Sequence, residues 1–437
     1  MALIGLNERI GYLQIGITAM RILIVFPLLF LFTAFAAGAE LFPNAELGER
    51  PGAYSARTLG LGRAVLTMES GAPALLGNPA LLAVPGDRLR FDVTTDVTRI
   101  KETRAYPIHD AFDGVLAYNN YTMNDHLFSK LDGGIVYNMP YGRLPVLALG
   151  VGTYSVYRFD YRYREEVRYR NAVGGILDLP LANNHLDING DLRSFSCGLA
   201  IKERLPLTVG LAVSMLTGNW SYEEGTFWVV EDSSNIVTRT EYSLDGIPSE
   251  MTVGLAYDLS ERVSLGARSL FPTSRFDYDA HTRKEQNGDT SYSDTTLSVR
   301  YPSRFGLGVQ FRPRNEFMPR LVLEGEYITY SDVHEAWDNV IEIRAGVEQQ
   351  VVRGVPVRAG FYYAKAPDSN ERALAVFSTG IGFQHKNIVA DFGMEIGKIN
   401  YTYPDLFPNT RFGGARIDVD RVETGLWRGV VSVRYEL

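Results

Sequence analysis

Histidines are the first candidates for chemistry in this sequence, because imidazole is the commonest metal ligand and a frequent general base. None of them lies at a spacing that a metal site or a Ser–His–Asp triad would need, and all fall in segments expected to be loops or turns. The six are His109, His126, His185, His281, His334 and His385. The sequence therefore predicts no catalytic residue, no metal site and no cofactor.

Two further signs of chemistry are missing or incomplete. The sequence contains neither G-x-S-x-G nor H-E-x-x-H, the patterns of two large hydrolase classes. Asp187–Asp191 ("DINGD") offers alternating oxygen ligands, as the start of a calcium loop does, but lacks the later glycine and glutamate. We interpret it as a solvated turn, and we expect no enzyme. Enzymatic activity stays open as an alternative.

The composition excludes several classes of protein. There are 51 acidic against 43 basic side chains and no Lys/Arg cluster, so nothing indicates nucleic acid as a partner. A single cysteine, Cys197, rules out a small disulfide scaffold. The 42 glycines, 25 tyrosines and 22 phenylalanines suit an all-β protein with tight turns and aromatic bands.

The amino-terminal residues have the pattern of an export signal. An apolar stretch over 22–35 follows Arg21 and leads into Ala37-Gly38-Ala39, which predicts a signal peptide over residues 1–39. Met20 directly precedes Arg21, so residues 1–19 are either part of this leader or an upstream extension that is not translated. A retained membrane helix is the alternative, but the stretch is shorter than the roughly 20 residues that a bilayer span needs.

From residue 88 onward the sequence alternates between apolar and polar residues. In "RLVLEGEYITY", for example, Leu321 and Leu323 oppose Glu324 and Glu326. This period of two predicts strands with one apolar and one polar face. A soluble sandwich with its apolar faces inside and a membrane barrel with its apolar face outside both fit the pattern.

The lengths of the connections favour the barrel. Short turns are expected near 141–145, 203–206, 258–262, 313–319, 351–355 and 385–386. Long polar connections lie between them, at about 101–130, 161–191, 223–249, 276–295, 331–339, 366–374 and 400–424. Strict alternation of short and long is typical of outer-membrane barrels, whose periplasmic turns are short. Six turns and seven long connections give 14 strands over 88–437, with the strand-like stretch 112–122 assigned to a long connection.

Charged residues on the polar faces of these strands would face the barrel lumen. They are Glu324, Glu326, Glu342, Arg344, Glu348, Arg358, Asp391, Glu395 and Arg434. They can be read as a selectivity lining or as the ordinary polar interior of a water-filled barrel.

Residues 40–87 precede the first strand and predict a plug. A 14-stranded lumen is wide enough to need filling, since eight strands are already filled by their own side chains. Gly60 and Gly62 would let the backbone approach the wall, and Asn78-Pro79 would fix a turn that directs Ala80 and Leu81. A disordered linker is the alternative, but the segment is rich in leucine. The predicted fold is thus an all-β transmembrane antiparallel barrel of 14 strands with an amino-terminal plug.

Two motifs in this segment resemble the FadL family of outer-membrane transporters of long-chain fatty acids and hydrocarbons. "GLGRA" at 60–64 and "NPAL" at 78–81 are similar to the hatch of that family, and 301–313 and 340–367 resemble its strands. Two features depart from the family: Glu69-Ser70 replaces an acidic pair, and Leu437 stands where phenylalanine is common. The resemblance implies that the hatch, or gate, includes Gly60, Gly62, Arg63, Asn78, Pro79, Ala80 and Leu81.

The resemblance also implies a function: passive uptake of fatty acids or of aromatic and alkyl hydrocarbons across the outer membrane of a Gram-negative bacterium. Phe227, Trp228, Val229 and Val230 form an apolar run in a long connection, which indicates a ligand-binding surface or a packed lid. The expected partners are a hydrophobic small molecule, outer-membrane lipid or lipopolysaccharide, and the barrel assembly machinery. A shuttle or scaffold barrel of a secretion system and a general porin remain alternatives.

Overall fold

The computed structural model describes most of the chain after the expected leader. The described residues are 47–83, 89–141, 144–170, 178–202, 206–229, 235–314, 319–352, 354–368, 372–413 and 419–437. The predicted signal peptide and the outer limits of the predicted plug lie outside these ranges. No helix among the described residues is long and apolar enough to cross a membrane.

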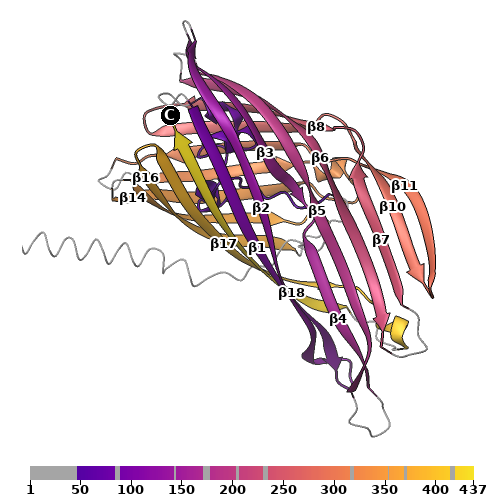
Figure 1. The fold of residues 1–437 in the computed structure, drawn as a ribbon. Coiled ribbons are helices and arrows are strands. Elements are labelled where there is room, and N and C mark those ends of the chain that lie inside the picture. Colours follow the sequence, from indigo (N-terminus) through magenta and orange to yellow (C-terminus); the bar gives the residue numbers. More distant parts are fainter. Residues whose placement is uncertain are drawn as a thin grey trace, which may run out of the picture. The chain divides into compact units, whose positions relative to one another are not determined.

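Fourteen antiparallel strands form a closed β-barrel (Figure 1). They are β1 (Leu89–His109), β2 (Val115–Tyr141), β3 (Leu144–Arg158), β5 (Asp178–Lys202), β6 (Leu207–Trp228), β8 (Ser249–Asp258), β9 (Val263–Pro272), β12 (Arg304–Phe311), β13 (Arg320–Ile328), β14 (Val340–Val352), β15 (Val355–Lys365), β16 (Ala373–His385), β17 (Ile388–Tyr403) and β18 (Asp420–Glu436). Each pairs with the next in this order.

The ring closes where the last strand meets the first. β18 pairs with β1 in a register that runs from Arg90 opposite Glu436 to Ala105 opposite Arg421. Closure removes the open sheet edges whose unpaired amides a lipid environment cannot satisfy. The prediction of a 14-stranded antiparallel barrel with short turns at one end is confirmed.

The long connections are more regular than predicted. Four additional strands extend the wall beyond the ring at the end opposite the short turns: β4 (Tyr161–Arg170), β7 (Ile236–Leu244), β10 (Phe276–Gln286) and β11 (Asp289–Val299). β4 pairs with β5, β7 pairs with β6 and β10, and β11 pairs with β10. The loop interpretation was wrong here because these segments are rich in charged and polar residues, and yet ladder hydrogen bonds continue along them, with aromatic side chains on the inward faces of β4 and β10. We call this part of the wall the strand extension.

Two local assignments also need correction. The stretch 112–122, assigned to a loop, enters β2 at Val115, directly after a turn in which Asp110 Oδ1 accepts hydrogen bonds from Phe112 N and Gly114 N at 2.8 Å each. The "DINGD" sequence is not a turn but lies within β5, paired with β6. The first assignment was wrong because the stretch continues into the same long strand, β2, and so adds no strand to the count. In the second, cross-strand pairing outweighs the turn preference of Asp, Asn and Gly residues.

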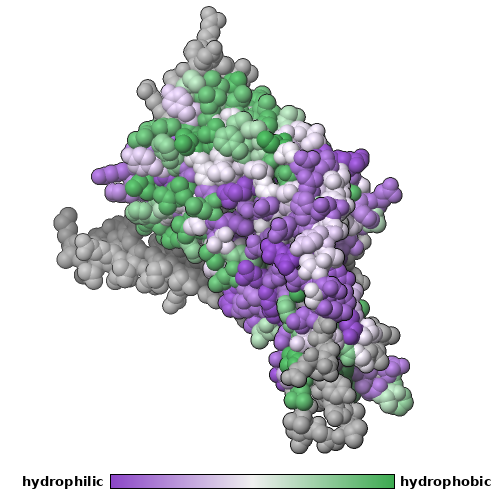
Figure 2. Space-filling view, turned by 45° about the vertical axis from the view of Figure 1, so that its right-hand side comes forward, coloured by the Kyte–Doolittle hydropathy of each residue, from purple (hydrophilic) through white to green (hydrophobic). Residues whose placement is uncertain are grey.

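Outward-facing side chains form an apolar band around the ring. On β18, Val431, Val433 and Tyr435 are 42–45% exposed, while Arg434 between them points inward to the Asp92 carboxylate, 2.7 Å away. Figure 2 shows apolar surface gathered in the upper part of the view and polar surface along the right and lower parts, which belong to the strand extension. The apolar band marks the part of each strand that contacts lipid.

We predict that Val433→Arg destabilises the barrel by about 2–4 kcal/mol, the cost of an arginine near the bilayer midplane. Unfolding in urea of the protein refolded into lipid vesicles, followed by heat-modifiable gel mobility, measures this difference. Val433→Leu is the matched control and should unfold like the wild type. Equal stability of the two variants would contradict the assignment of this face to lipid.

Candidate functional site

Residues 47–83, here called the hatch segment, contact the inward face of the barrel. The segment contains α2 (Ala56–Leu59) and two short 3-10 helices, η1 (Ala72–Leu75) and η2 (Pro79–Leu82), visible in indigo among the strands in Figure 1. Most of its side chains are buried, including Leu61 and Leu66, which have no exposed surface. A segment this rich in buried leucine and poor in regular structure is stabilised by its contacts with the wall.

A buried carboxylate organises the inside of the hatch segment. Glu69 accepts hydrogen bonds from Ser55 Oγ at 2.8 Å, Thr58 Oγ1 at 3.0 Å and Ser70 N at 3.1 Å. Ser55 also caps α2 by accepting a hydrogen bond from Thr58 N. Burial raises the pKa of Glu69, and these hydrogen bonds oppose the shift. Glu69 thus ties the start of the hatch segment to its middle.

Glycines on the wall allow the hatch backbone to approach closely. Six pairs of glycines face each other across neighbouring strands: Gly134 and Gly152, Gly150 and Gly198, Gly210 and Gly254, Gly266 and Gly308, Gly346 and Gly360, Gly380 and Gly393. At each pair, a Cβ added to at least one member would lie within 3.5 Å of an atom of the hatch segment. The wall therefore has a girdle of positions without side chains at the level of the hatch.

The tightest contact in this girdle involves Gly62. A Cβ on Gly360 would lie 2.0 Å from Gly62 N, and a Cβ on Gly62 would lie 2.3 Å from Phe361 O. Gly62 also has φ of +67°, which a residue with a side chain rarely adopts, and its amide donates to Ser378 Oγ at 2.9 Å. Gly60 lies against Gly380 in the same way, with 3.3 Å between the Gly60 Cα and the position of a Cβ on Gly380.

Arg63 of the hatch motif is held in an unusual conformation by buried contacts. It has φ of +64°, which is uncommon for a residue other than glycine. Its guanidinium forms a bidentate ion pair with Glu395, at 2.7 and 3.0 Å, and lies 4.4 Å from the Tyr362 ring centroid. Glu395 has no exposed surface, so each buried charge depends on the other. Such strain persists only where the surrounding contacts determine the conformation.

Other inward-facing charges also bind the hatch segment. Glu324 accepts hydrogen bonds from the consecutive amides of Val65, Leu66 and Thr67, at 2.9 to 3.0 Å. Further contacts are the ion pairs Arg57–Glu348 and Arg50–Glu250, and hydrogen bonds from Arg90, Arg268, Arg428 and Arg434 to hatch carbonyls. Several of the charges predicted to face the lumen therefore bind the hatch segment. They include Glu324, Glu348 and Arg434.

The second hatch motif forms a turn, as predicted. Asn78 caps η2, since its Oδ1 accepts a hydrogen bond from Ala80 N at 3.1 Å, and its Nδ2 donates to Leu66 O and to Leu255 O of β8. Pro79 and Ala80 lie against the glycine pair Gly210 and Gly254. Leu81 is partly buried and packs against the aromatic cluster described next.

An apolar, mainly aromatic cluster lies on the inner face between the hatch and the strand extension. Its buried members on the wall include Tyr154, Tyr157, Phe159, Tyr161, Tyr163, Leu186, Ile188, Leu192, Leu216, Trp220, Phe276, Tyr278 and Tyr301. Trp220 stacks between Phe159 and Tyr242, with centroid distances of 4.6 and 3.8 Å. Leu75, Leu76 and Leu82 of the hatch join the same cluster. Apolar contact is therefore continuous from the extension to the hatch.

The connection after β17 crosses toward this cluster. Residues 404–413, here called the strap, include η4 (Asn409–Phe412). Phe407 is buried and stacks on Tyr163 of β4 at 6.1 Å, while Phe412 packs on Trp228 of β6 at 5.3 Å. Arg411 pairs with Glu224 of β6 at 2.8 Å. The strap thus joins β17 and β18 to strands that lie several positions away around the ring.

The apolar run predicted to bind ligand does not form one patch. Phe227 and Trp228 belong to β6, where successive side chains point to opposite faces. Phe227 stacks on His185 on the outer face, at 5.1 Å, whereas Trp228 packs inward against the strap. Val229 directly follows the strand and its side chain is exposed. Val230 lies outside the described residues.

The histidines are placed differently from the prediction. Only His334 of the six lies outside a strand; His109, His126, His185, His281 and His385 lie in β1, β2, β5, β10 and β16. Among the described residues, one group of three possible metal ligands lies close together: His185, Asp187 and Glu223. Sequence spacing missed it because Glu223 joins the other two only through the β5–β6 pairing.

Sequence reasoning also missed the aromatic cluster. Its signal was present in "YRFDYRY", where aromatic side chains stand at Tyr157, Phe159, Tyr161 and Tyr163, every second position. Alternating aromatics were counted as ordinary strand composition, although these point into the lumen, where polar residues were expected.

Comparison with known proteins agrees with this architecture. A Pseudomonas aeruginosa FadL homologue superposes with a TM-score of 0.62 at 13% identity, over 89% of this chain and 99% of that one. The toluene transporters TodX of P. putida and TbuX of Ralstonia pickettii each give a TM-score of 0.57 at 14% identity, over 88% of this chain and 99% and 98% of theirs. The chain has the FadL fold. No protein-family model matches the sequence, and no curated protein does.

The FadL fold gives the two hatch motifs their setting. Both were identified by resemblance, and in the structure both lie against glycine pairs of the wall, Gly62 against β15 and Pro79 against β6 and β8. The contacts that surround them, especially Glu395 and Glu324, come from strands far away in sequence.

We predict that Gly360→Ala displaces the hatch, because the new methyl group would occupy the position of the Gly62 amide. The expected result is a folded barrel with clearly higher single-channel conductance in planar bilayers. Gly325→Ala is the control: this glycine lies on the outward face of β13, where the nearest atom to an added Cβ is 4.0 Å away. Conductance that is the same for both variants would show that the close contact does not hold the hatch in place.

A second prediction concerns the buried pair. Arg63→Met leaves the Glu395 carboxylate without its bidentate partner, and breaking such a pair costs about 3–5 kcal/mol. Amide hydrogen exchange over residues 59–68 should accelerate accordingly. The double variant Arg63→Met/Glu395→Gln should recover much of the protection, and a double variant as labile as the single one would contradict the pairing argument.

Proposed function

We propose that this protein is an outer-membrane channel for the passive uptake of hydrophobic small molecules. The observation that carries the proposal is the apolar cluster that runs along the inner face from Trp220 and Tyr242 to Leu75 and Leu82 of the hatch segment. An inward-facing apolar surface offers a path for molecules that leave water readily. In this proposal the short turns are periplasmic and the strand extension faces outward.

The described functions of solved structures with the same fold support this proposal. Two are described as toluene transporters and a third, CymD, as a monoaromatic hydrocarbon channel. A general porin needs a wet lumen, whereas the described part of this lumen holds the hatch segment and buried aromatics. Nothing in the described structure favours a shuttle or scaffold role.

Polar atoms inside the cluster refine the class of ligand. The hydroxyls of Tyr54 and Tyr154 and the indole nitrogen of Trp220 are buried, and none of these three has a hydrogen-bond partner within the described chain. Buried donors are usually satisfied. A mainly apolar ligand that carries one acceptor, such as a fatty acid or an oxygenated aromatic, would supply the missing partner.

The hatch residues act as the gate in this proposal. Gly60, Gly62 and Arg63 press one side of the segment against β15, β16 and β17, while Asn78, Pro79, Ala80 and Leu81 press the other against β6 and β8 and the cluster. Of the apolar run, we assign Trp228 to the ligand path because it faces the strap. Phe227 and Val229 are exposed and would meet the lipopolysaccharide layer instead.

The proposed function requires that the barrel be inserted in the outer membrane. A chain with this fold would need export and the barrel assembly machinery, with lipid and lipopolysaccharide around its apolar band. No cofactor is required, since passive uptake needs none.

We predict that Trp220→Ser lowers the uptake of a fluorescent fatty acid by at least about fivefold, because the stacked rings on either side lose their apolar partner. Uptake is measured in cells that carry the protein as their main route for the probe. Trp427→Ser, on the outward face of β18 opposite Arg99, is the matched control and should transport normally.

Ion conductance and heat-modifiable mobility establish that both variants are folded. If the wild-type protein took up neither fatty acids nor alkanes nor aromatics, the transport proposal would fail. If Trp220→Ser transported as well as Trp427→Ser, the path would not run through the aromatic cluster.

A further inference from the structure

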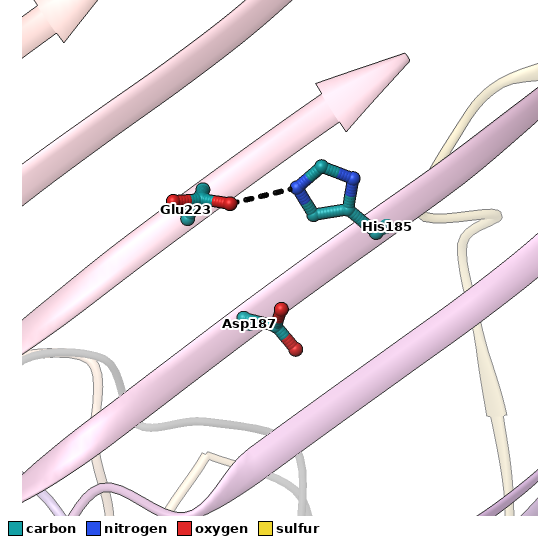
Figure 3. A group of neighbouring side chains, drawn as sticks. All are labelled: His185, Asp187 and Glu223. Atoms are coloured by element: carbon teal, nitrogen blue, oxygen red, sulfur yellow. Dashed lines mark hydrogen bonds and ion pairs between the residues drawn. The ribbon is translucent and has the colours of Figure 1, made fainter. Parts of the chain in front are cut away.

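Three side chains that bind metals in other proteins meet on the outer face of the strand extension. His185 and Asp187 lie two residues apart on β5, so both point to the same face. Glu223 of β6 stands directly opposite Asp187 in the antiparallel register. Figure 3 shows His185 and Glu223 turned toward each other, with Asp187 beside them. None of the three takes part in the hatch contacts or the aromatic cluster.

The distances suit a shared ion. His185 Nε2 lies 3.1 Å from Glu223 Oε1, and one ligand atom from each of the three residues lies within 4.8 Å of the others. Tetrahedral ligands at about 2.0–2.2 Å from Zn²⁺ stand roughly 3.3–3.6 Å from one another, so the His185–Glu223 spacing is already close and a small side-chain shift completes the set. Two ligands at i and i+2 on one strand and a third across the ladder form one face of a coordination sphere, which leaves the outward positions open to water.

The imidazole is held in place before any ion binds. A Cβ on Gly225, which pairs with His185 across the ladder, would lie 2.4 Å from His185 Cε1, so the ring lies over this glycine. The His185 ring also stacks on the Phe227 ring, with an interplanar angle of 19°. His185 is largely buried by these contacts. A ring fixed between strands loses little freedom on metal binding, which favours affinity.

Two arginines now partner the carboxylates. Arg164 forms a bidentate pair with Asp187, with Nη1 at 2.9 Å from Oδ1 and Nη2 at 2.5 Å from Oδ2, so an ion at Asp187 must displace at least one of these contacts, and Arg239 pairs with Glu223 at 3.5 Å. Both arginine side chains are 49% exposed. Exposed ion pairs contribute little free energy and long side chains can turn toward solvent. Each carboxylate can therefore give an oxygen to an ion, with the arginine kept as an outer partner or released.

We propose that His185 Nε2 and the carboxylates of Asp187 and Glu223 bind one divalent transition-metal ion, with Zn²⁺ as the representative. The imidazole nitrogen favours such an ion over Ca²⁺ or Mg²⁺, which prefer sites made of oxygen alone. Water completes the coordination on the outer side. The bound ion ties β5 to β6 in the strand extension, outside the apolar band.

The test uses the full-length protein refolded in detergent free of lipopolysaccharide, because lipopolysaccharide itself binds divalent ions. After treatment with EDTA, calorimetric titration with Zn²⁺ should show one site per chain. His185→Gln and, separately, Glu223→Gln should weaken binding by at least about 100-fold, the upper range reported for residues that only support a metal ligand. Co²⁺ in place of Zn²⁺ should give a visible absorption band that His185→Gln abolishes.

His281→Gln is the matched control. His281 also pairs with a carboxylate on the strand extension, Asp294 at 2.9 Å, but it belongs to no group of three ligands among the described residues. This variant should bind Zn²⁺ like the wild type. Absence of binding by the wild type, binding that survives in His185→Gln, or equal loss in His281→Gln would each overturn the proposal. Heat-modifiable mobility excludes a failure to fold as the cause.

Discussion

Direct backbone contact between the hatch segment and the barrel wall is the constraint on which the rest of the structure depends. A side chain on the inward face would hold the two backbones several ångströms apart, and the paired glycines remove this obstacle on strand after strand. At Gly360 the space for even one methyl group is occupied by the hatch itself. Once the backbones touch, the polar atoms of the hatch have only the wall to satisfy them.

Charged side chains of the wall provide the hydrogen-bond partners for these polar atoms of the hatch. Glu324 accepts from three consecutive hatch amides, and arginines such as Arg268 and Arg428 donate to hatch carbonyls. Buried charges of this kind are stable only when paired and hydrogen-bonded, so hatch and wall are mutually dependent. Any movement of the hatch that admits a ligand must exchange several of these contacts together, which makes a gate with two discrete arrangements more natural than a gradual one.

The fold could be predicted largely from the sequence, and the site only in part. The alternation of short and long connections determined the number of strands. The alternation of apolar and polar residues marked only the part of each strand that contacts lipid. It missed β4, β7 and β10, whose inward faces carry aromatic residues where polar ones were expected, and β11, which is mostly polar on both faces. The hatch was found through the residues at 60–64 and 78–81, but its partners depend on register and closure. Glu223 lies 38 residues from His185, so only the β5–β6 ladder could bring them together.

The hairpin of β10 and β11 has a consequence for how such a chain can vary. β11 is bonded to β10, and the closed ring of fourteen strands is complete without either. Residues 289–296 of β11 are exposed, whereas Leu297 and Val299 at its end pack in the aromatic cluster. Insertions, deletions or an epitope tag at Asn287-Gly288 would therefore leave assembly intact. This hairpin tip can therefore vary in length and sequence far more freely than the glycine girdle, where an added Cβ would meet the hatch segment.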